Sequence, residues 1–131
     1  MEVKKRMGIW MDYATAHLIH LATQPGDDST LVSNFTYEEK LSVAGKGKSW
    51  MHTKEAYEQL SYYKKLGEAI KNYNSVLLFG PTTAKMELLN LLHSSPQFAG
   101  IRIETKHTDK MTANQRYAFV KDHFKSRWLD M

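Results

Sequence analysis

A basic, glycine-containing segment lies between residues 40 and 54 of this 131-residue chain, and its residue types suit phosphate contact. No acidic residue occurs between Glu39 and Glu55. Lysines neutralise phosphates, glycines allow the backbone to approach closely, and an exposed tryptophan can stack on a base. The alternative without a ligand is a solvated loop whose tryptophan packs on the core. The candidate RNA-binding residues of this predicted loop are Gly45, Lys46, Gly47, Lys48, Trp50 and Lys54.

Carboxylates are the second group that could perform chemistry. A two-metal nuclease needs several carboxylates at one place, because hard divalent cations prefer oxygen ligands. One carboxylate of such a site usually lies mid-way along the first strand, and Asp12 is near that position. Glu55 or Glu58 could add a second ligand from the following helix, and Asp122 another from the last helix. The end of the fourth predicted strand, however, reads Phe79-Gly80-Pro81 and supplies no acid. A turn carboxylate is therefore the favoured role of Asp12.

The segment from Gly80 to Lys85 joins a predicted strand to a predicted helix. Free N–H groups at a helix N-terminus attract anions, which makes Thr82, Thr83 and Lys85 a candidate anion site. The spacing of a P-loop is absent, and a helix cap is the favoured interpretation. The six histidines form no ligand set and the chain has no cysteine, so we expect neither a metal nor a cofactor.

Strand and helix patterns alternate along the chain. Two apolar segments flanking Tyr13-Ala14-Thr15 predict a hairpin, and residues 31–41 predict a third strand. After the loop at 42–51, a helix is expected over 52–73, with Ala56, Leu60, Tyr63, Ile70 and Tyr73 on its buried stripe and Leu66 beside it.

The second half continues the alternation. Residues 75–79 predict a strand buried on both faces, followed by a helix that Thr82 or Thr83 caps and that ends at Ser94-Ser95-Pro96. Residues 101–106 predict another strand. Thr112 and Gln115 form a capping box before a last helix, whose stripe is Ala113, Tyr117, Val120, Phe124 and Trp128.

The resulting order, β-β-β-α-β-α-β-α, predicts an α/β fold with a five-stranded mixed sheet and helices packed on it. This is the order of ribonuclease-H-like domains. Length predicts a single domain over residues 1–131, and 42% hydrophobic residues suffice for a core. We expect a cytoplasmic protein with no membrane segment, because no apolar run approaches the ~20 residues of a span. The net charge of +4 is compatible with a polyanionic partner.

Three segments carry a resemblance to a known group: Gly8–Asp12 with Ala14-Thr15-Ala16, Leu78–Leu88, and Thr108–Gln115. Together they resemble the stand-alone bacterial relatives of the middle domain of eukaryotic- and archaeal-type class I release factors and of Pelota. The resemblance implies a ribonuclease-H-like fold without nuclease chemistry. It also implies that the basic loop occupies the position of the family's Gly-Gly-Gln tip, which helps water attack peptidyl-tRNA.

The corresponding stretch here, Ala44 to Trp50, has neither the adjacent glycine pair nor the glutamine, and Gln59 lies too deep in the predicted helix to replace it. We therefore expect a translation-associated protein that binds RNA or the ribosome without releasing peptides, and no catalytic residues. Two alternatives stay open: a metal-dependent nuclease or hydrolase using Asp12, and a protein-interaction module. The sequence leaves the oligomeric state undetermined.

Overall fold

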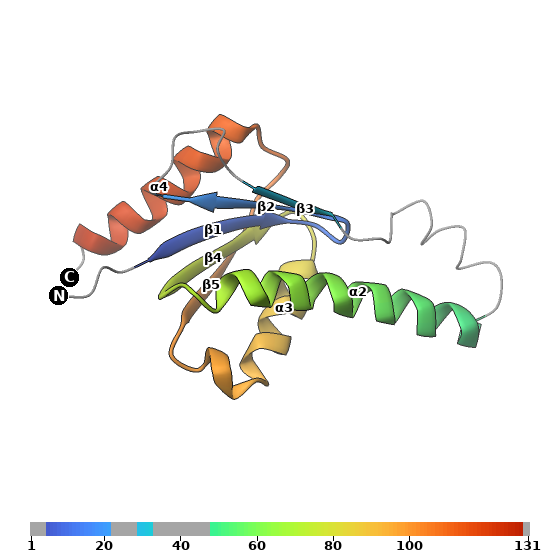
Figure 1. The fold of residues 1–131 in the computed structure, drawn as a ribbon. Coiled ribbons are helices and arrows are strands. Elements are labelled where there is room, and N and C mark those ends of the chain that lie inside the picture. Colours follow the sequence, from blue (N-terminus) through green and yellow to red (C-terminus); the bar gives the residue numbers. More distant parts are fainter. Residues whose placement is uncertain (1–4, 22–28, 33–47, 130–131) are drawn as a thin grey trace.

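The computed structural model describes residues 5–21, 29–32 and 48–129, with side-chain surroundings for residues 5–21 and 57–125. Its centre is a mixed sheet with the strand order β3-β2-β1-β4-β5 (Figure 1). The strands are β1 (Arg6–Met11), β2 (Thr15–His20), β3 (Ser29–Val32), β4 (Ser75–Gly80) and β5 (Arg102–His107). The predicted α/β class with a mixed sheet and packed helices is confirmed.

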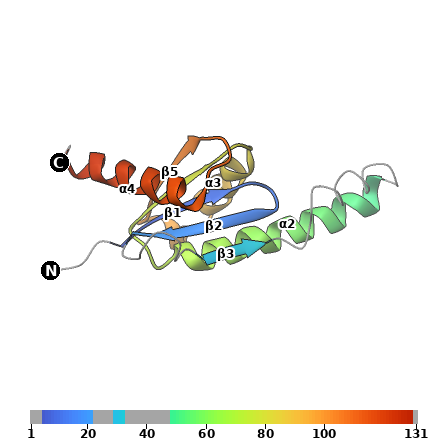
Figure 2. The same cartoon turned by 90° about the horizontal axis from the view of Figure 1, so that it is seen from above.

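Three helices cover the two faces of the sheet. One face carries α4 (Ala113–Leu129), and the other carries α2 (Lys48–Ile70) and α3 (Ala84–His93), as Figures 1 and 2 show. A short 3-10 turn, η1 (Pro96–Phe98), follows α3. Among the described helices, none has the length and apolar character that a membrane span requires.

The strand directions follow from the connections. A tight turn joins β1 to β2, and β1 pairs antiparallel with β2. The long connections that contain helices bring β4 beside β1 and β5 beside β4, and both of these pairs are parallel. Parallel neighbours need such crossovers, whereas antiparallel neighbours can be joined by a short turn.

The central strands are buried on both faces. In β1, Met7, Ile9 and Met11 pack toward α2 and α3, whereas Trp10 joins the cluster under α4. The same alternation in β4 divides Val76 and Leu78 from Leu77 and Phe79. This two-sided burial explains why both strands read as continuous apolar runs rather than as alternating ones.

The first long helix begins earlier than the sequence predicts. Residues 48–51, which belong to the predicted loop, form the first turn of α2. No glycine or proline occurs from Lys48 to Leu66, so each added residue extends the hydrogen-bonded helix once it has begun. The prediction that Lys48 and Trp50 belong to a loop is therefore wrong.

The buried stripe of α2 is also displaced from the predicted one. Leu60 is 40% exposed, whereas the neighbouring Tyr62 is only 2% exposed. Tyr63, Leu66 and Ile70 are buried as predicted. The predicted stripe with Leu60 and the observed stripe with Tyr62 both have helical spacing, and the orientation of α2 on the sheet determines which one is buried.

Several local predictions are confirmed. The backbone N–H of Thr112 donates to Gln115 Oε1 at 2.9 Å, and that of Gln115 donates to Thr112 Oγ1 at 3.2 Å, which completes the capping box. α3 ends at His93, directly before the predicted stop. Of the predicted third strand, the structure describes only residues 31 and 32 as part of β3, and residues 33–41 lie outside the described residues.

Candidate functional site

The hairpin turn after β1 accounts for the carboxylate of Asp12. Its Oδ1 accepts backbone N–H groups from Ala14 at 2.9 Å and Thr15 at 2.8 Å. The backbone N–H of Asp12 also donates to the carbonyl of Thr15 at 3.0 Å. This is the local side-chain-to-backbone bonding by which aspartate stabilises a turn. The described part of the chain contains no group of three or more metal-ligating side chains. The structure thus supports the turn interpretation of Asp12.

The loop between β4 and α3 lies at the same edge of the sheet. Gly80 has φ +146°, and a Cβ there would meet the carbonyl oxygen of Met11 at 2.1 Å, so only glycine fits. The ammonium of Lys85, which is 6% exposed, donates to the carbonyl oxygens of Gly80 at 3.0 Å and of Thr82. Burial lowers the pKa of this ammonium below its ordinary value.

These contacts bear on the candidate anion site. The N–H of Ala84 donates to Thr82 Oγ1 at 3.2 Å, and Thr83 Oγ1 is hydrogen-bonded to the hydroxyl of Tyr13. Each of Thr82, Thr83 and Lys85 thus has an intramolecular partner that holds the turn together. Thr83 occupies the N-cap position of α3, but its side chain makes no capping hydrogen bond. The predicted side-chain cap by Thr83 is therefore wrong, and anion binding stays a prediction.

A network of tyrosines around Glu87 joins the hairpin turn to α2 and α3. The hydroxyl of Tyr63 donates to Glu87 Oε1 at 2.8 Å, and that of Tyr13 donates to Oε2 at 3.1 Å. Burial and the nearby carboxylate raise the pKa of Tyr63. Burial, with a contribution from Asp12, also raises the pKa of Tyr62, whose hydroxyl donates to the carbonyl of Asp12 at 3.0 Å. Both phenols therefore stay protonated and act as hydrogen-bond donors. The sequence gives no signal for this network, because its members are far apart in the chain.

The predicted RNA-binding residues fall at the start of α2. The helix α2 includes Lys48, Trp50 and Lys54. Gly45, Lys46 and Gly47 lie outside the described residues. The amino-terminal half of α2 extends beyond the sheet in both views (Figures 1 and 2). Gln59 lies inside α2, and its amide donates to the carbonyl of Tyr13 at 3.3 Å. That bond directs its amide group to the hairpin turn.

The outer face of α2 contains exposed side chains that lie outside the predicted RNA-binding residues. Tyr57 is 75% exposed, and Lys64 and Lys65 are exposed two turns further along. Their i, i+7 and i+8 spacing places them on one helical face. The spacing alone could have indicated a shared face, but not that this face is the exposed one.

Comparison with known proteins gives the fold a precedent. No protein-family model matches this chain, and no curated protein matches it. Among solved structures, the Pelota protein of Thermoplasma acidophilum is similar at a TM-score of 0.52 and 22% identity, over 91% of this chain and 32% of that one. Pelota of Archaeoglobus fulgidus is similar at 0.59 and 7% identity, over 93% of this chain and 32% of that one.

At these identities the likeness concerns the fold. The chain spans about a third of the length of either Pelota protein, so it corresponds to one part of them. The chain thus has an α/β fold similar to that of a Pelota domain.

Proposed function

We propose that this chain is a translation-associated domain that binds RNA or the ribosome. The observation that carries the proposal is the similarity in fold to two Pelota proteins over 91% and 93% of the chain. Within this proposal, residues 1–131 form one domain related to the middle, ribonuclease-H-like domain of Pelota and class I release factors. The protein would be one of the stand-alone bacterial relatives and would act in the cytoplasm, where ribosomes are.

The start of α2 is the proposed contact surface. An α-helix of 23 residues is about 35 Å long, and the first described buried side chain of α2 is Tyr62. The first turn contains no acidic residue, so the positive end of the helix dipole adds to the charge of Lys48 and Lys54. Together with Lys46 and Trp50, these residues suit contact with phosphates and a base.

The proposed role is binding rather than peptide release. The segment that would hold a Gly-Gly-Gln tip reads Gly45-Lys46-Gly47-Lys48 and contains no glutamine. Gln59 is engaged with the carbonyl of Tyr13 inside the fold. Gln59 is therefore not proposed as a substitute for the missing glutamine.

Ribosome co-sedimentation tests the proposal. The full chain is expected to sediment with ribosomes at low salt and to dissociate as salt rises, because each phosphate contact releases counterions. The double substitution Lys46→Glu and Lys48→Glu should abolish sedimentation. Absence of the wild-type chain from ribosomal fractions at low salt would refute the proposal.

The matched control reverses two charges elsewhere. Lys121 and Lys125 are exposed on α4, on the opposite side of the sheet from α2. The double substitution Lys121→Glu and Lys125→Glu changes the net charge by the same amount and should leave most of the sedimentation intact. Equal loss in both variants would show that overall charge, rather than the start of α2, determines binding.

A further inference from the structure

The face of α2 that points away from the sheet combines aromatic, aliphatic and basic side chains. Its members share the spacing i, i+3, i+4, i+7, i+8 and i+11, which defines one side of a helix. We call them the outer stripe of α2: Tyr57, Leu60, Ser61, Lys64, Lys65 and Glu68.

The outer stripe exposes two large apolar side chains. Tyr57 is 75% exposed and Leu60 is 40% exposed. Among the described side chains, Met86 is the remaining large hydrophobic residue with comparable exposure. Isolated exposed apolar residues are common, but an aromatic ring and a leucine one turn apart form a surface on which a planar group can lie.

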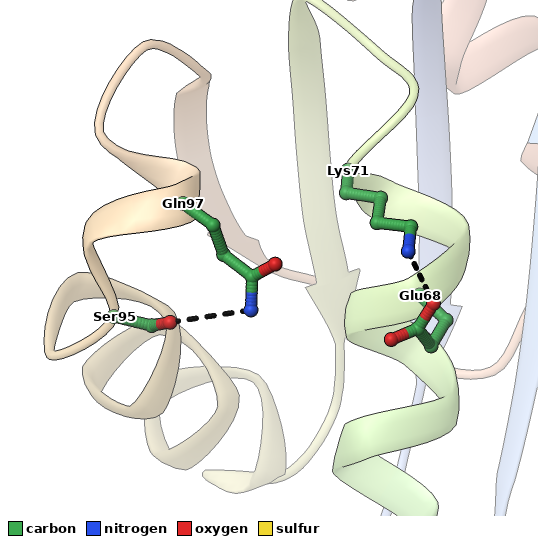
Figure 3. Close-up of polar contacts among 4 residues, drawn as sticks. All are labelled: Glu68, Lys71, Ser95 and Gln97. Atoms are coloured by element: carbon green, nitrogen blue, oxygen red, sulfur yellow. Dashed lines mark hydrogen bonds and ion pairs between the residues drawn. The ribbon is translucent and has the colours of Figure 1, made fainter.

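The outer stripe has a net positive charge, because it contains two lysines and one glutamate. Lys64 and Lys65 are exposed. The one acidic member, Glu68, forms an ion pair with Lys71 at 2.6 Å, which Figure 3 shows. The ammonium of Lys71 therefore offsets the carboxylate, and the charges of Lys64 and Lys65 remain uncompensated within the stripe.

These side chains line a shallow hollow of about 250 Å³. Tyr57 and Lys64 are seven residues apart, which corresponds to about 10 Å along a helix. A nucleotide presents both a flat apolar base and a phosphate. A tyrosine ring stacks on the former and lysines neutralise the latter.

We propose that the outer stripe of α2 binds single-stranded RNA, with a base stacked on Tyr57 beside Leu60 and the adjoining phosphates at Lys64 and Lys65. This inference rests on the proposed function and extends it, since the stripe continues the proposed contact surface along the same helix. The lysines favour RNA over a protein partner, because the centres of protein–protein interfaces are depleted in lysine.

Fluorescence anisotropy with labelled ten-nucleotide oligouridylate and oligoadenylate tests the stacking contact. Tyr57→Leu keeps an apolar side chain but removes the aromatic ring, and it should weaken binding about tenfold, as expected for one stacked base. Tyr57→Phe keeps the ring and should stay within about twofold of the wild type. Circular dichroism establishes that each variant is folded, which we expect because Tyr57 is exposed.

The salt dependence tests the phosphate contacts. In the double substitution Lys64→Gln and Lys65→Gln, the slope of log affinity against log salt should decrease by about 0.7 for each lysine lost. The matched control, Lys121→Gln and Lys125→Gln on the exposed face of α4, should leave the slope unchanged. Equal slopes in the stripe variant and the wild type would overturn the phosphate assignment.

The outcomes separate this inference from the proposed function. Suppose that the wild type sediments with ribosomes. If Tyr57→Leu then binds the oligonucleotides normally, or if the wild type binds neither oligonucleotide, the stripe is not the RNA contact and the proposed function stands. If Tyr57→Leu weakens ribosome sedimentation while its oligonucleotide affinity is unchanged, the stripe contacts protein. If the wild type fails to sediment at all, the proposed function itself is wrong.

Discussion

The two faces of the sheet are held by different means. On the face under α2 and α3, the apolar cluster is bordered by neutral hydroxyl donors around Glu87. On the face under α4, Val120 contacts the backbone of β1 at Gly8, and the ring of His123 is paired with Glu104 at 2.8 Å. The face under α2 and α3 should therefore tolerate small changes of side-chain volume and of pH. The stability of the face under α4 should be sensitive to both.

Gly8→Ala should have the largest effect. A Cβ at Gly8 would lie 2.2 Å from Cγ2 and 2.9 Å from Cγ1 of Val120, so α4 would have to move away from β1. Overpacking of this kind costs about 3 kcal/mol, at the upper end of the usual range. Urea denaturation measures the loss. Val120→Ala removes the clashing methyl groups, so the double variant should lose less stability than the two single losses added together. Losses that simply add would argue against direct contact.

The stability of the α4 face should depend on pH through His123. Its side chain is 4% exposed, and burial, with Lys106 and Arg102 nearby, lowers the pKa of the ring. Glu104 acts in the opposite direction, since a carboxylate favours the imidazolium. Burial outweighs this effect, because the neutral ring can also donate to Glu104, whose side chain is 22% exposed and so is partly screened by water.

The pH at which this stability is lost depends on proton binding by His123. Below the ordinary pKa of about 6.5, the unfolded chain binds a proton that the folded ring resists, so this contribution to stability is complete above 6.5 and decreases as the pH falls toward the lowered pKa. His123→Gln keeps a donor toward Glu104 but does not titrate, and it should flatten the decrease between pH 7.5 and 5.5. His93→Gln, at an exposed position, is the matched control. Identical pH profiles for wild type and His123→Gln would show that the pair does not sense pH.

Tyr63→Phe should have a moderate effect on the α2 and α3 face. It removes one hydrogen bond to Glu87, while Tyr13 still donates to the same carboxylate. The expected cost is about 1 kcal/mol in urea denaturation. Tyr57→Phe makes the same chemical change at an exposed position of the same helix and should alter stability little. A loss well above that of one hydrogen bond would mean that the network acts as a unit.

Gly67→Ala should have the smallest effect and is the counterpart of Gly8→Ala. A Cβ at Gly67 would lie 3.3 Å from Cζ of Phe98 and 3.6 Å from Cδ2 of Leu92, both at the ends of side chains. The gain in helix propensity, about 1 kcal/mol, opposes this mild crowding. We expect a net change within about 1 kcal/mol by thermal or urea denaturation. A loss as large as that of Gly8→Ala would remove the distinction between the two faces.

The predictions that succeeded depend on neighbours in the chain. The capping box of Thr112 and Gln115 spans three residues, and the turn at Asp12 is held by N–H groups two and three residues later. The stop after His93 follows from a proline three residues beyond it. Such contacts are set by backbone geometry that the residue types specify locally. They therefore appear in the sequence without knowledge of the rest of the fold.

The predictions that failed depend on the orientation of an element. Leu60 and Tyr62 both fit a buried stripe of α2; the predicted stripe contains Leu60, whereas Tyr62 is the buried residue. The predicted start of α2 at residue 52 is too late, because the first turns of a helix without a strong apolar period resemble a loop in sequence. The contact of Gly8 with Val120, 112 positions apart, likewise has no signal in either segment alone.

Patterns among neighbouring residues are enough to predict most of the strands and helices that the structure describes, where several of them stop, and that a basic stretch precedes or begins the first long helix. The packing of the folded chain was needed to show which side of that helix faces the sheet, and hence that Tyr57, Lys64 and Lys65 share the exposed side. The physical reason is that hydrophobic periodicity specifies a pattern around a helix axis, whereas the rotation of the helix about that axis is decided by the surface against which it packs.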